Sequence, residues 1–150
     1  MIQTNELKVG NKIHSSFDEK VHTVLGVIGK WDAPQNTLND SVMIESSWLK
    51  SENCIPIPLT EEWLNKFGFT WIKDANTFVI PIAKMKLQKM VITFDGDRPI
   101  IFSIADYYTG KEMIAIYKDV SVQYVHQLQN LYFYLTGEEL VLKETATATA

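Results

Sequence analysis

The chain of 150 residues has the length of one ordinary domain, and its 46% hydrophobic and 11% aromatic composition is typical of a folded globular protein. A formal net charge of −4 and a single arginine, Arg98, argue against nucleic-acid binding, because phosphate backbones are bound by clustered cations. Cys54 is the only cysteine, which excludes an intramolecular disulfide and a cysteine-based zinc cluster.

The N-terminal part of the chain is predicted to be rich in β-strands and turns. Its strand-forming residues begin near residue 6 and recur over 21–28 and 41–45. Gly, Pro, Asn and Asp concentrate over residues 29–40, so an exposed loop carrying Trp31 is expected there. Pro56 and Pro58 then force an extended backbone, which predicts a hinge.

The next segment predicts a short helix followed by β-hairpins. Thr60 is a suitable N-cap, and Gly68 can end the helix after Phe67 in the left-handed conformation. Turn residues at 74–76 and 95–97 predict hairpins over 71–82 and 86–104, and a further strand is expected over 112–118.

A final helix is predicted over residues 121–136, with Ser121 as its cap and Gly137 as its stop. Its apolar residues recur every three or four positions, so they form one stripe that is expected to pack against the sheet. Residues 140–142 are expected to add an edge strand, and residues 143–150 are expected to be disordered. The stripe consists of Tyr124, Val125, Leu128, Leu131, Tyr132 and Leu135.

These elements predict a single α+β domain over residues 1–142, in which an antiparallel sheet is packed by two helices. Residues 1–55 form a β-rich, small barrel-like half, and residues 59–142 contain the helices and hairpins. The N-terminus lacks the features of a secretory signal, and no apolar run reaches the roughly 18 residues of a membrane span. A cytoplasmic location without membrane association is therefore expected.

Three segments resemble a family of short, mostly uncharacterised proteins of Bacteroidota genomes and their phages or prophages. They are the opening NELKVGN, PIPLTEEWLNKFGF and YVHQLQNLYFYLTGEEL. The C-terminal segment is the specific part of this resemblance. It implies a mobile-element context and the cytoplasm of a bacterial host cell, and it carries over no catalytic residue. Small accessory proteins of phages often act by binding, which makes a host protein or a small ligand the expected partner.

The polar side of the last helix is the main candidate for a binding surface. It carries His126, Gln127, Gln129 and Asn130, and Tyr134 lies on the same strip as Gln127. Amide and imidazole groups can hydrogen-bond the edges of a small ligand or a peptide. The same groups would also suit a solvated face, or bonds to neighbouring loops that hold the helix in place.

Other residue patterns give little support for catalysis. The chain contains no GxxxxGK, GxGxxG, HExxH or GxSxG motif, and the spacing of His14, His22 and His126 matches no metal site. No catalytic residue, metal ligand or cofactor is therefore predicted. Trp31 is the second candidate for a partner contact, since an aromatic ring in a polar loop often marks an interface.

The sequence thus predicts a protein that binds a host protein or a small ligand, including a nucleotide, without binding nucleic acid. A symmetric homo-oligomer is compatible with this interpretation. Two alternatives remain: a small hydrolase or nucleotide-processing enzyme, and a structural or virion-associated oligomeric module.

Overall fold

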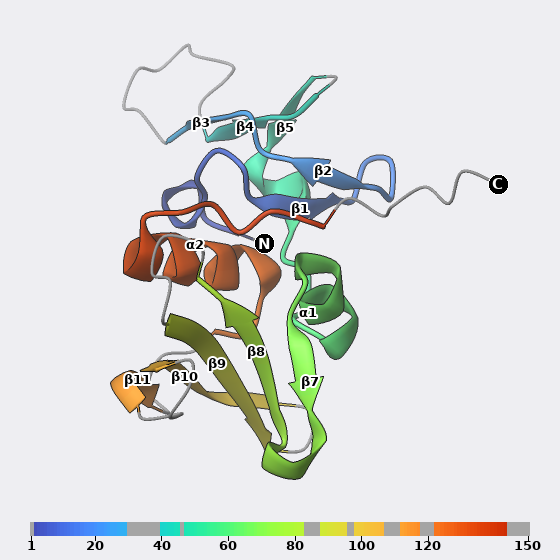
Figure 1. Cartoon of the computed structure of the whole chain (residues 1–150). Coiled ribbons are helices and arrows are strands. Elements are labelled where there is room, and N and C mark those ends of the chain that lie inside the picture. The colour runs from blue at the N-terminus through green and yellow to red at the C-terminus, as the bar shows by residue number, and fades with distance from the viewer. Residues whose placement is uncertain are drawn as a thin grey trace, which may run out of the picture. The chain divides into compact units, whose positions relative to one another are not determined.

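The computed structural model describes residues 2–29, 40–45, 47–82, 88–95, 98–106, 112–117 and 122–143. Over these residues the chain forms three antiparallel sheets and two α-helices, which confirms the predicted α+β class (Figure 1). No helix within these ranges is long and apolar enough to cross a membrane.

The chain divides into two compact units. The first unit contains Met1–Pro58 together with Tyr124–Leu135, and the second contains Leu59–Gln123 together with Thr136–Ala150. The first boundary between the two units follows Pro58. It lies at the end of the segment in which Pro56 and Pro58 predict a hinge. The final helix therefore groups with the N-terminal segment, although the sequence places it in the second half.

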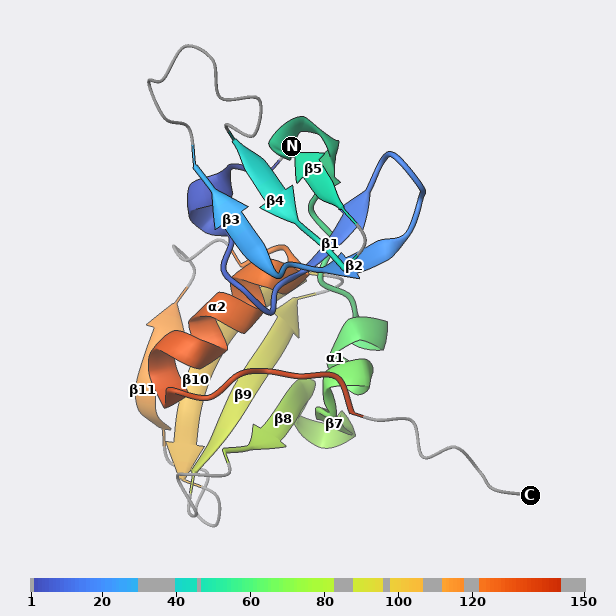
Figure 2. The ribbon, with the colours of Figure 1, turned by 90° about the horizontal axis from the view of Figure 1, so that it is seen from above.

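Short strands of the first unit form two antiparallel sheets (Figure 2). The elements are η1 (Thr4–Glu6), β1 (Lys12–Ser15), β2 (Val21–Thr23), β3 (Gly26–Ile28), β4 (Ser41–Met43), β5 (Trp48–Lys50), η2 (Ser51–Asn53) and β6 (Cys54–Ile55). The strand orders are β2-β1-β6 and β3-β4-β5. Ile13, Val42 and Leu49 belong to one buried cluster supplied by both sheets. Because the strands are divided between two sheets, the expected barrel-like closure is not confirmed.

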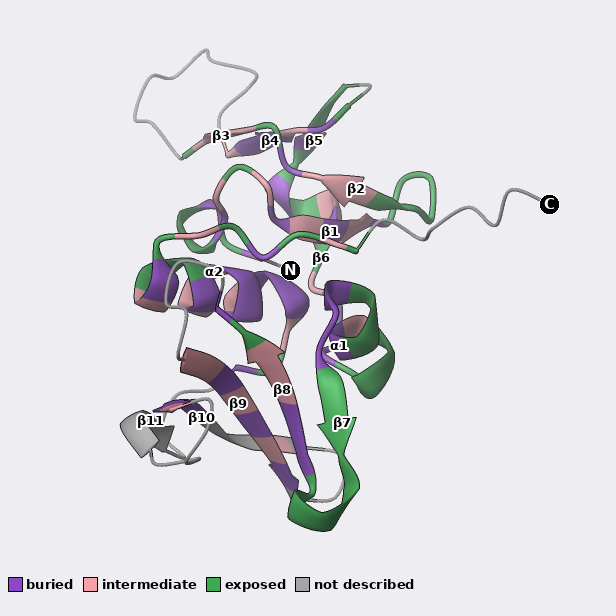
Figure 3. Ribbon diagram, viewed as in Figure 1, coloured by how far each residue is buried: buried purple, intermediate pink, exposed green. Residues whose placement is uncertain are grey.

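The described part of the second unit contains a short helix and a five-stranded antiparallel sheet (Figure 1). Its elements are α1 (Glu61–Phe67), β7 (Thr70–Ile72), η3 (Lys73–Ala75), β8 (Thr77–Pro81), β9 (Gln88–Asp95), β10 (Arg98–Asp106) and β11 (Glu112–Tyr117). The order β11-β10-β9-β8-β7 confirms both predicted hairpins and the strand after them. All three residues of the edge strand β7 are exposed (Figure 3).

Local sequence signals account for the limits of α1. Thr60 occupies the N-cap position with an extended backbone, although its side chain makes no capping hydrogen bond. Gly68 ends the helix with φ +88°, and its N–H bonds the carbonyl oxygen of Asn65 at 2.9 Å. Residues 140–143 form no strand, contrary to the prediction for 140–142. Instead, the Lys143 N–H bonds the Lys66 carbonyl oxygen at 2.9 Å.

The last helix, α2 (Val125–Thr136), begins later than predicted. The predicted cap Ser121 lies outside the described residues. The side chain of Gln127 reaches back to the helix start, where its Oε1 accepts a 3.2 Å bond from the Tyr124 N–H. Gly137, with φ +70°, follows the last helical residue as predicted. Within the apolar stripe, Val125, Leu128 and Tyr132 are buried.

Candidate functional site

The side-chain amide of Gln129 hydrogen-bonds the backbone of the first unit through both its oxygen and its nitrogen. Its side chain is 2% exposed and lies opposite the segment that enters β1. The Oε1 atom accepts a 2.8 Å bond from the Lys12 N–H, and Nε2 donates a 3.1 Å bond to the Gly10 carbonyl oxygen. The amide therefore satisfies one backbone donor and one backbone acceptor, which is a structural role.

Asn130 makes a second connection between α2 and the N-terminal segment. Its Nδ2 donates a 2.7 Å bond to the carbonyl oxygen of Glu6, and its Oδ1 accepts a 3.0 Å bond from Asn11 Nδ2. Asn11 is itself fully buried, and its Oδ1 accepts a 2.8 Å bond from the Lys8 N–H. Gln129 and Asn130, two of the three predicted amides, thus bond neighbouring loops, which is the structural alternative that the sequence left open.

The remaining predicted residues of α2 are distributed differently. Gln127 caps the helix start, as described above, and is half-buried. Tyr134 is 85% exposed. Next to it in the sequence is Phe133, and the Nζ atom of Lys8 lies 4.3 Å from the centre of the Phe133 ring. Tyr134 is therefore the member of the predicted set that is open to a partner. Trp31, the other predicted contact, lies outside the described residues.

His126 is buried without hydrogen bonds in the described part of the chain. Its side chain is 1% exposed, and neither ring nitrogen has a hydrogen-bond partner there. The imidazole stacks on Tyr124 with ring centres 5.9 Å apart, and Nε2 lies 3.7 Å from Glu6 Oε2. Burial lowers the pKa of His126, and the nearby Glu6 carboxylate opposes this only in part. The neutral imidazole has no access to an outside ligand.

His22 lies between two carboxylates in the first unit. Its Nε2 is 2.9 Å from Asp18 Oδ2, and its Nδ1 is 3.2 Å from Glu45 Oε2. Burial alone would lower the pKa of His22, but the hydrogen bonds and charges of Asp18 and Glu45 outweigh it and raise the pKa. Both ring nitrogens then act as donors, so the imidazolium connects the two acidic side chains.

The pKa values of both carboxylates, Asp18 and Glu45, are lowered in this arrangement. The hydrogen bond from His22 is the main reason that the pKa of Asp18 is lowered. For Glu45, burial acts in the opposite direction, yet hydrogen bonds from its own backbone, from Thr23 and from His22 lower the pKa to about 2. The Thr23 N–H donates to Glu45 Oε1 at 2.9 Å. The ionised network connects β2 with Asp18 before it and with Glu45, which follows β4.

The turn between β1 and β2, residues 16–20, presents an aromatic side chain to solvent. Phe17 is 81% exposed, and we call this segment the Phe17 turn. On the adjacent sheet, cross-strand pairing places Val21 and Ile55 on either side of His14. Val21 and Ile55 are both exposed large apolar residues. Phe17 is not among the predicted contact residues. A single aromatic residue in a polar turn could have indicated it as one.

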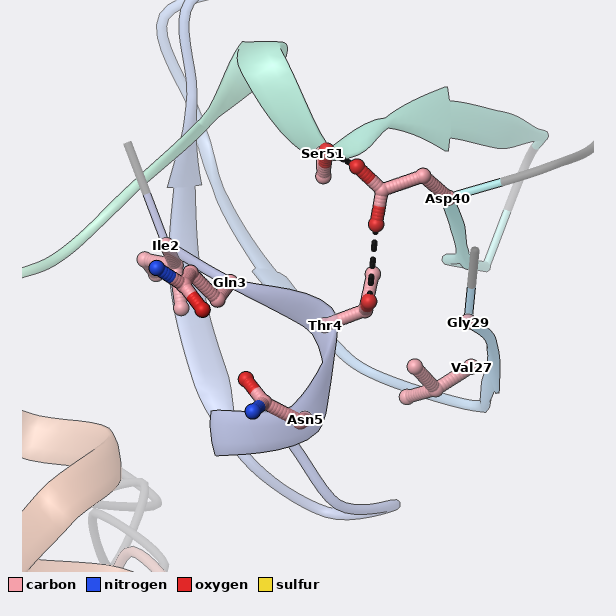
Figure 4. Close-up of a pocket in the computed structure, with 8 residues that line it drawn as sticks. All are labelled: Ile2, Gln3, Thr4, Asn5, Val27, Gly29, Asp40 and Ser51. Carbon is pink, nitrogen blue, oxygen red and sulfur yellow. Dashed lines mark hydrogen bonds between the residues drawn. The ribbon is translucent and has the colours of Figure 1, made fainter. Parts of the chain in front are cut away.

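A pocket of about 630 Å³ lies beside η1 in the first unit (Figure 4). One of its lining groups is the carboxylate of Asp40, which accepts a 2.7 Å bond from the Thr4 hydroxyl and a 2.6 Å bond from the Ser51 hydroxyl. Gln3 and Asn5 also line this space. The sequence predicts only a loop around Asp40, because its hydroxyl partners Thr4 and Ser51 lie 36 and 11 positions away.

Cys54 is buried and chemically unreactive. Burial, with the nearby charge of Asp40 as a second cause, raises the pKa of the Cys54 thiol to about 11. A thiol with a raised pKa is a poor nucleophile at neutral pH, so Cys54 serves as a small core residue.

The described histidines do not assemble into a catalytic or metal-binding group. His14, His22 and His126 each approach different carboxylates, and none of them lines the pocket beside η1. Among the described residues, no group of three or more His, Cys, Asp or Glu side chains could hold a metal ion.

Comparison of the chain with protein-family models, with curated proteins and with solved structures finds no match in any of the three. The resemblance to phage and prophage proteins therefore stays a prediction.

Proposed function

We propose that this chain is a non-enzymatic accessory protein that binds a host protein, with the Phe17 turn as its main contact. The observation that carries the proposal is an aromatic side chain, Phe17, that is 81% exposed on a turn fixed by many hydrogen bonds. Rigidly held exposed aromatic residues are typical binding hot spots, because little conformational entropy is lost when a partner covers them.

The backbone of the turn is bonded both internally and to a neighbouring segment. The Phe17 N–H bonds Ser15 Oγ at 3.1 Å, and the Ser15 N–H bonds the Lys20 carbonyl oxygen at 2.9 Å. The Ser16 N–H bonds the carbonyl oxygen of Asn53 at 3.0 Å. Because these bonds form within the free protein, the backbone that carries the phenyl ring is already in place for a partner.

The surroundings of Phe17 indicate what kind of partner would fit. Val21 and Ile55 extend the apolar surface along the sheet. Glu19 and Glu45 are exposed carboxylates near the same edge. A partner with an apolar pocket surrounded by basic side chains would complement this surface in both hydrophobicity and charge.

The alternatives predicted from the sequence have less support. An enzyme of the predicted kind would place a histidine beside a bound substrate, and the described histidines do not line the pocket beside η1. Asp40 does line it, and its carboxylate already accepts bonds from the hydroxyls of Thr4 and Ser51. An oligomeric module could use the Phe17 turn between copies of the chain. A measurement of mass in solution distinguishes this alternative, because an oligomer through the turn would dissociate in a Phe17→Ala variant.

The proposal is tested by affinity capture from the host cytoplasm with three forms of the chain. The wild type, Phe17→Ala and Tyr134→Ala are immobilised at equal density, and bound proteins are identified by mass spectrometry. Tyr134→Ala is a matched control, because it removes an equally exposed aromatic ring from α2. Both variants should unfold at the wild-type temperature, since the deleted rings contribute little to the core.

The expected result is a host protein retained by the wild type and by Tyr134→Ala but lost from Phe17→Ala. Loss only from Tyr134→Ala would place the contact on α2, as the sequence predicts. Equal retention by all three forms would overturn the role of the Phe17 turn.

A further inference from the structure

A histidine outside the Phe17 turn holds the turn by its acidic side chain. His22 Nε2 lies 3.1 Å from Oδ1 and 2.9 Å from Oδ2 of Asp18, a residue at the centre of the turn. The Oδ1 atom of Asp18 also accepts a 3.3 Å bond from the Lys20 N–H. Asp18 therefore links the backbone of the turn to β2, the strand that contains His22.

The second ring nitrogen of His22 faces a carboxylate from another segment. Its Nδ1 lies 3.2 Å from Oε2 of Glu45, which follows β4, and the Thr23 N–H holds the other oxygen of Glu45 at 2.9 Å. Asp18 and Glu45 are the charged groups that act on the His22 ring in the described part of the chain. One imidazole therefore connects the Phe17 turn to the residues after β4.

The other titratable groups of this sheet lie on its opposite face. His22 pairs with Ile13 across β1 and β2, so both side chains point to one face. Lys12 and His14, on either side of Ile13, point to the other face, where His14 Nε2 lies 3.8 Å from Oε2 of Glu19. Glu19 also belongs to the Phe17 turn, so His14 is the competing titratable contact of this turn.

The strength of the connection through His22 depends on the charge of its ring. The imidazolium has two N–H donors, one for each carboxylate, whereas the neutral ring has one donor and one lone pair. Once the proton is lost, one carboxylate faces a lone pair and the bond to the other no longer joins opposite charges. The link from Asp18 to β2 is then weaker, whichever nitrogen keeps its proton. Burial lowers the pKa of His22, but the hydrogen bonds and charges of Asp18 and Glu45 outweigh it and raise the pKa above its usual value of about 6.5.

We propose that His22 is a pH-sensitive switch for the Phe17 turn: its imidazolium holds the turn in place, and loss of the proton loosens the turn and weakens binding through Phe17. Because the switch regulates the proposed contact through Phe17, it rests on that proposed function. Binding weakens because a looser turn must be ordered when the partner covers the phenyl ring. The expected loss of affinity from pH 6 to pH 8.5 is about threefold, which is typical of one solvent-accessible ion pair.

The first test follows the turn without a partner. Amide exchange of the Ser16 and Phe17 N–H groups, both of which are hydrogen-bonded, is measured by NMR from pH 6 to pH 8.5 and divided by the intrinsic rate at each pH. The Gly10 N–H, which bonds the Val24 carbonyl oxygen outside the turn, is the reference within the same unit. The ratio to this reference separates loosening of the turn from a change in the stability of the whole unit.

The protection of both turn amides relative to Gly10 should fall about threefold from pH 6 to pH 8.5 in the wild type. His22→Gln keeps an N–H donor but does not titrate, so its relative protection should stay constant. His14→Gln is the matched control from the same sheet and should behave like the wild type. Constant protection in the wild type, an equal fall in His22→Gln, or a fall that only His14→Gln abolishes would overturn the switch.

The second test measures the partner. The host protein captured by the wild type is captured again at pH 6 and at pH 8.5, and its retention should fall about threefold in the wild type but not in His22→Gln. Retention by Phe17→Ala at pH 6 would reject the contact through Phe17 and leave the exchange result standing. Retention that Phe17→Ala abolishes, but that falls with pH in neither form or equally in both, would keep the contact and reject the switch.

Discussion

Asn11 and Asn130 lie 119 positions apart in the chain, and Nδ2 of Asn11 donates a 3.0 Å hydrogen bond to Oδ1 of Asn130. The neighbouring Gln129 bonds the backbone of Gly10 and Lys12 in the same way. Side-chain amides of α2 therefore satisfy backbone groups of the segment that enters β1, in addition to the backbone bonds that Gly10 and Asn11 make with Val24. The polar face of the helix helps to hold the first unit together.

Replacing Gln129 by leucine should strongly destabilise the protein. The variant keeps the side-chain volume but leaves the Lys12 N–H and the Gly10 carbonyl oxygen unpaired in a buried environment. Unpaired buried groups of this kind should lower the free energy of unfolding by about 2–3 kcal/mol. Urea denaturation measures the loss. The control Gln3→Leu, at an exposed position, should change stability by less than about 0.5 kcal/mol. An equal loss in both variants would contradict this role.

Replacing Gly68 by alanine should also lower stability, through the backbone. Gly68 has φ +88°, and a left-handed conformation costs an L-residue about 1–2 kcal/mol. The added Cβ would approach Lys143 Cε, which is the flexible end of a side chain and can move. Gly29→Ala is the matched control, since no atom of the described residues lies within 4 Å of a Cβ there. Thermal unfolding should show a lower midpoint for Gly68→Ala alone, and equal midpoints would refute the explanation.

The features that the sequence predicted well are those with local causes. The end of α1 follows from Gly68, and the hairpin of β7 and β8 follows from turn residues around Asn76, which has φ +49°. Period-two alternation in the sequence likewise predicts Met90, Ile92 and Phe94 as inward residues of β9, and all three are buried. The same alternation predicts Ile100, Phe102 and Ile104 as inward residues of β10, and their side chains lie outside the described residues.

The features that the sequence could not assign depend on contacts between distant segments. The pattern of α2 showed a polar strip, but its partners lie at residues 6–12 and no local signal pairs them. The start of α2 was predicted too early, because the cap is formed by Gln127 reaching back to Tyr124. The Asp40 site needs Thr4, which lies 36 positions away. Such pairings become visible only once the chain is folded.

His22 should make stability fall as the pH rises above neutrality. Its folded-state pKa is raised above the unfolded value of about 6.5, so the network with Asp18 and Glu45 contributes fully below that pH. The contribution is lost as the pH rises through the folded-state pKa. The stability difference between wild type and His22→Gln should therefore shrink from pH 6 to pH 8, as measured by urea denaturation. A constant difference would show that the ion pairs contribute nothing.

His126 should produce a pH dependence of the opposite sign. Burial lowers its folded-state pKa, so the unfolded chain takes up a proton near pH 6.5 while the folded protein does not. Stability that is present above this pH is therefore lost as the pH falls toward the folded-state pKa. His126→Leu removes the proton uptake, so its stability relative to wild type should improve steadily from pH 8 to pH 5. Glu6→Gln removes the carboxylate that lies 3.7 Å from Nε2. Since this carboxylate favours the charged imidazole, the variant should lose stability more steeply as the pH falls. Parallel stability curves for wild type and His126→Leu would show that the pKa of His126 is the same in the folded and unfolded states.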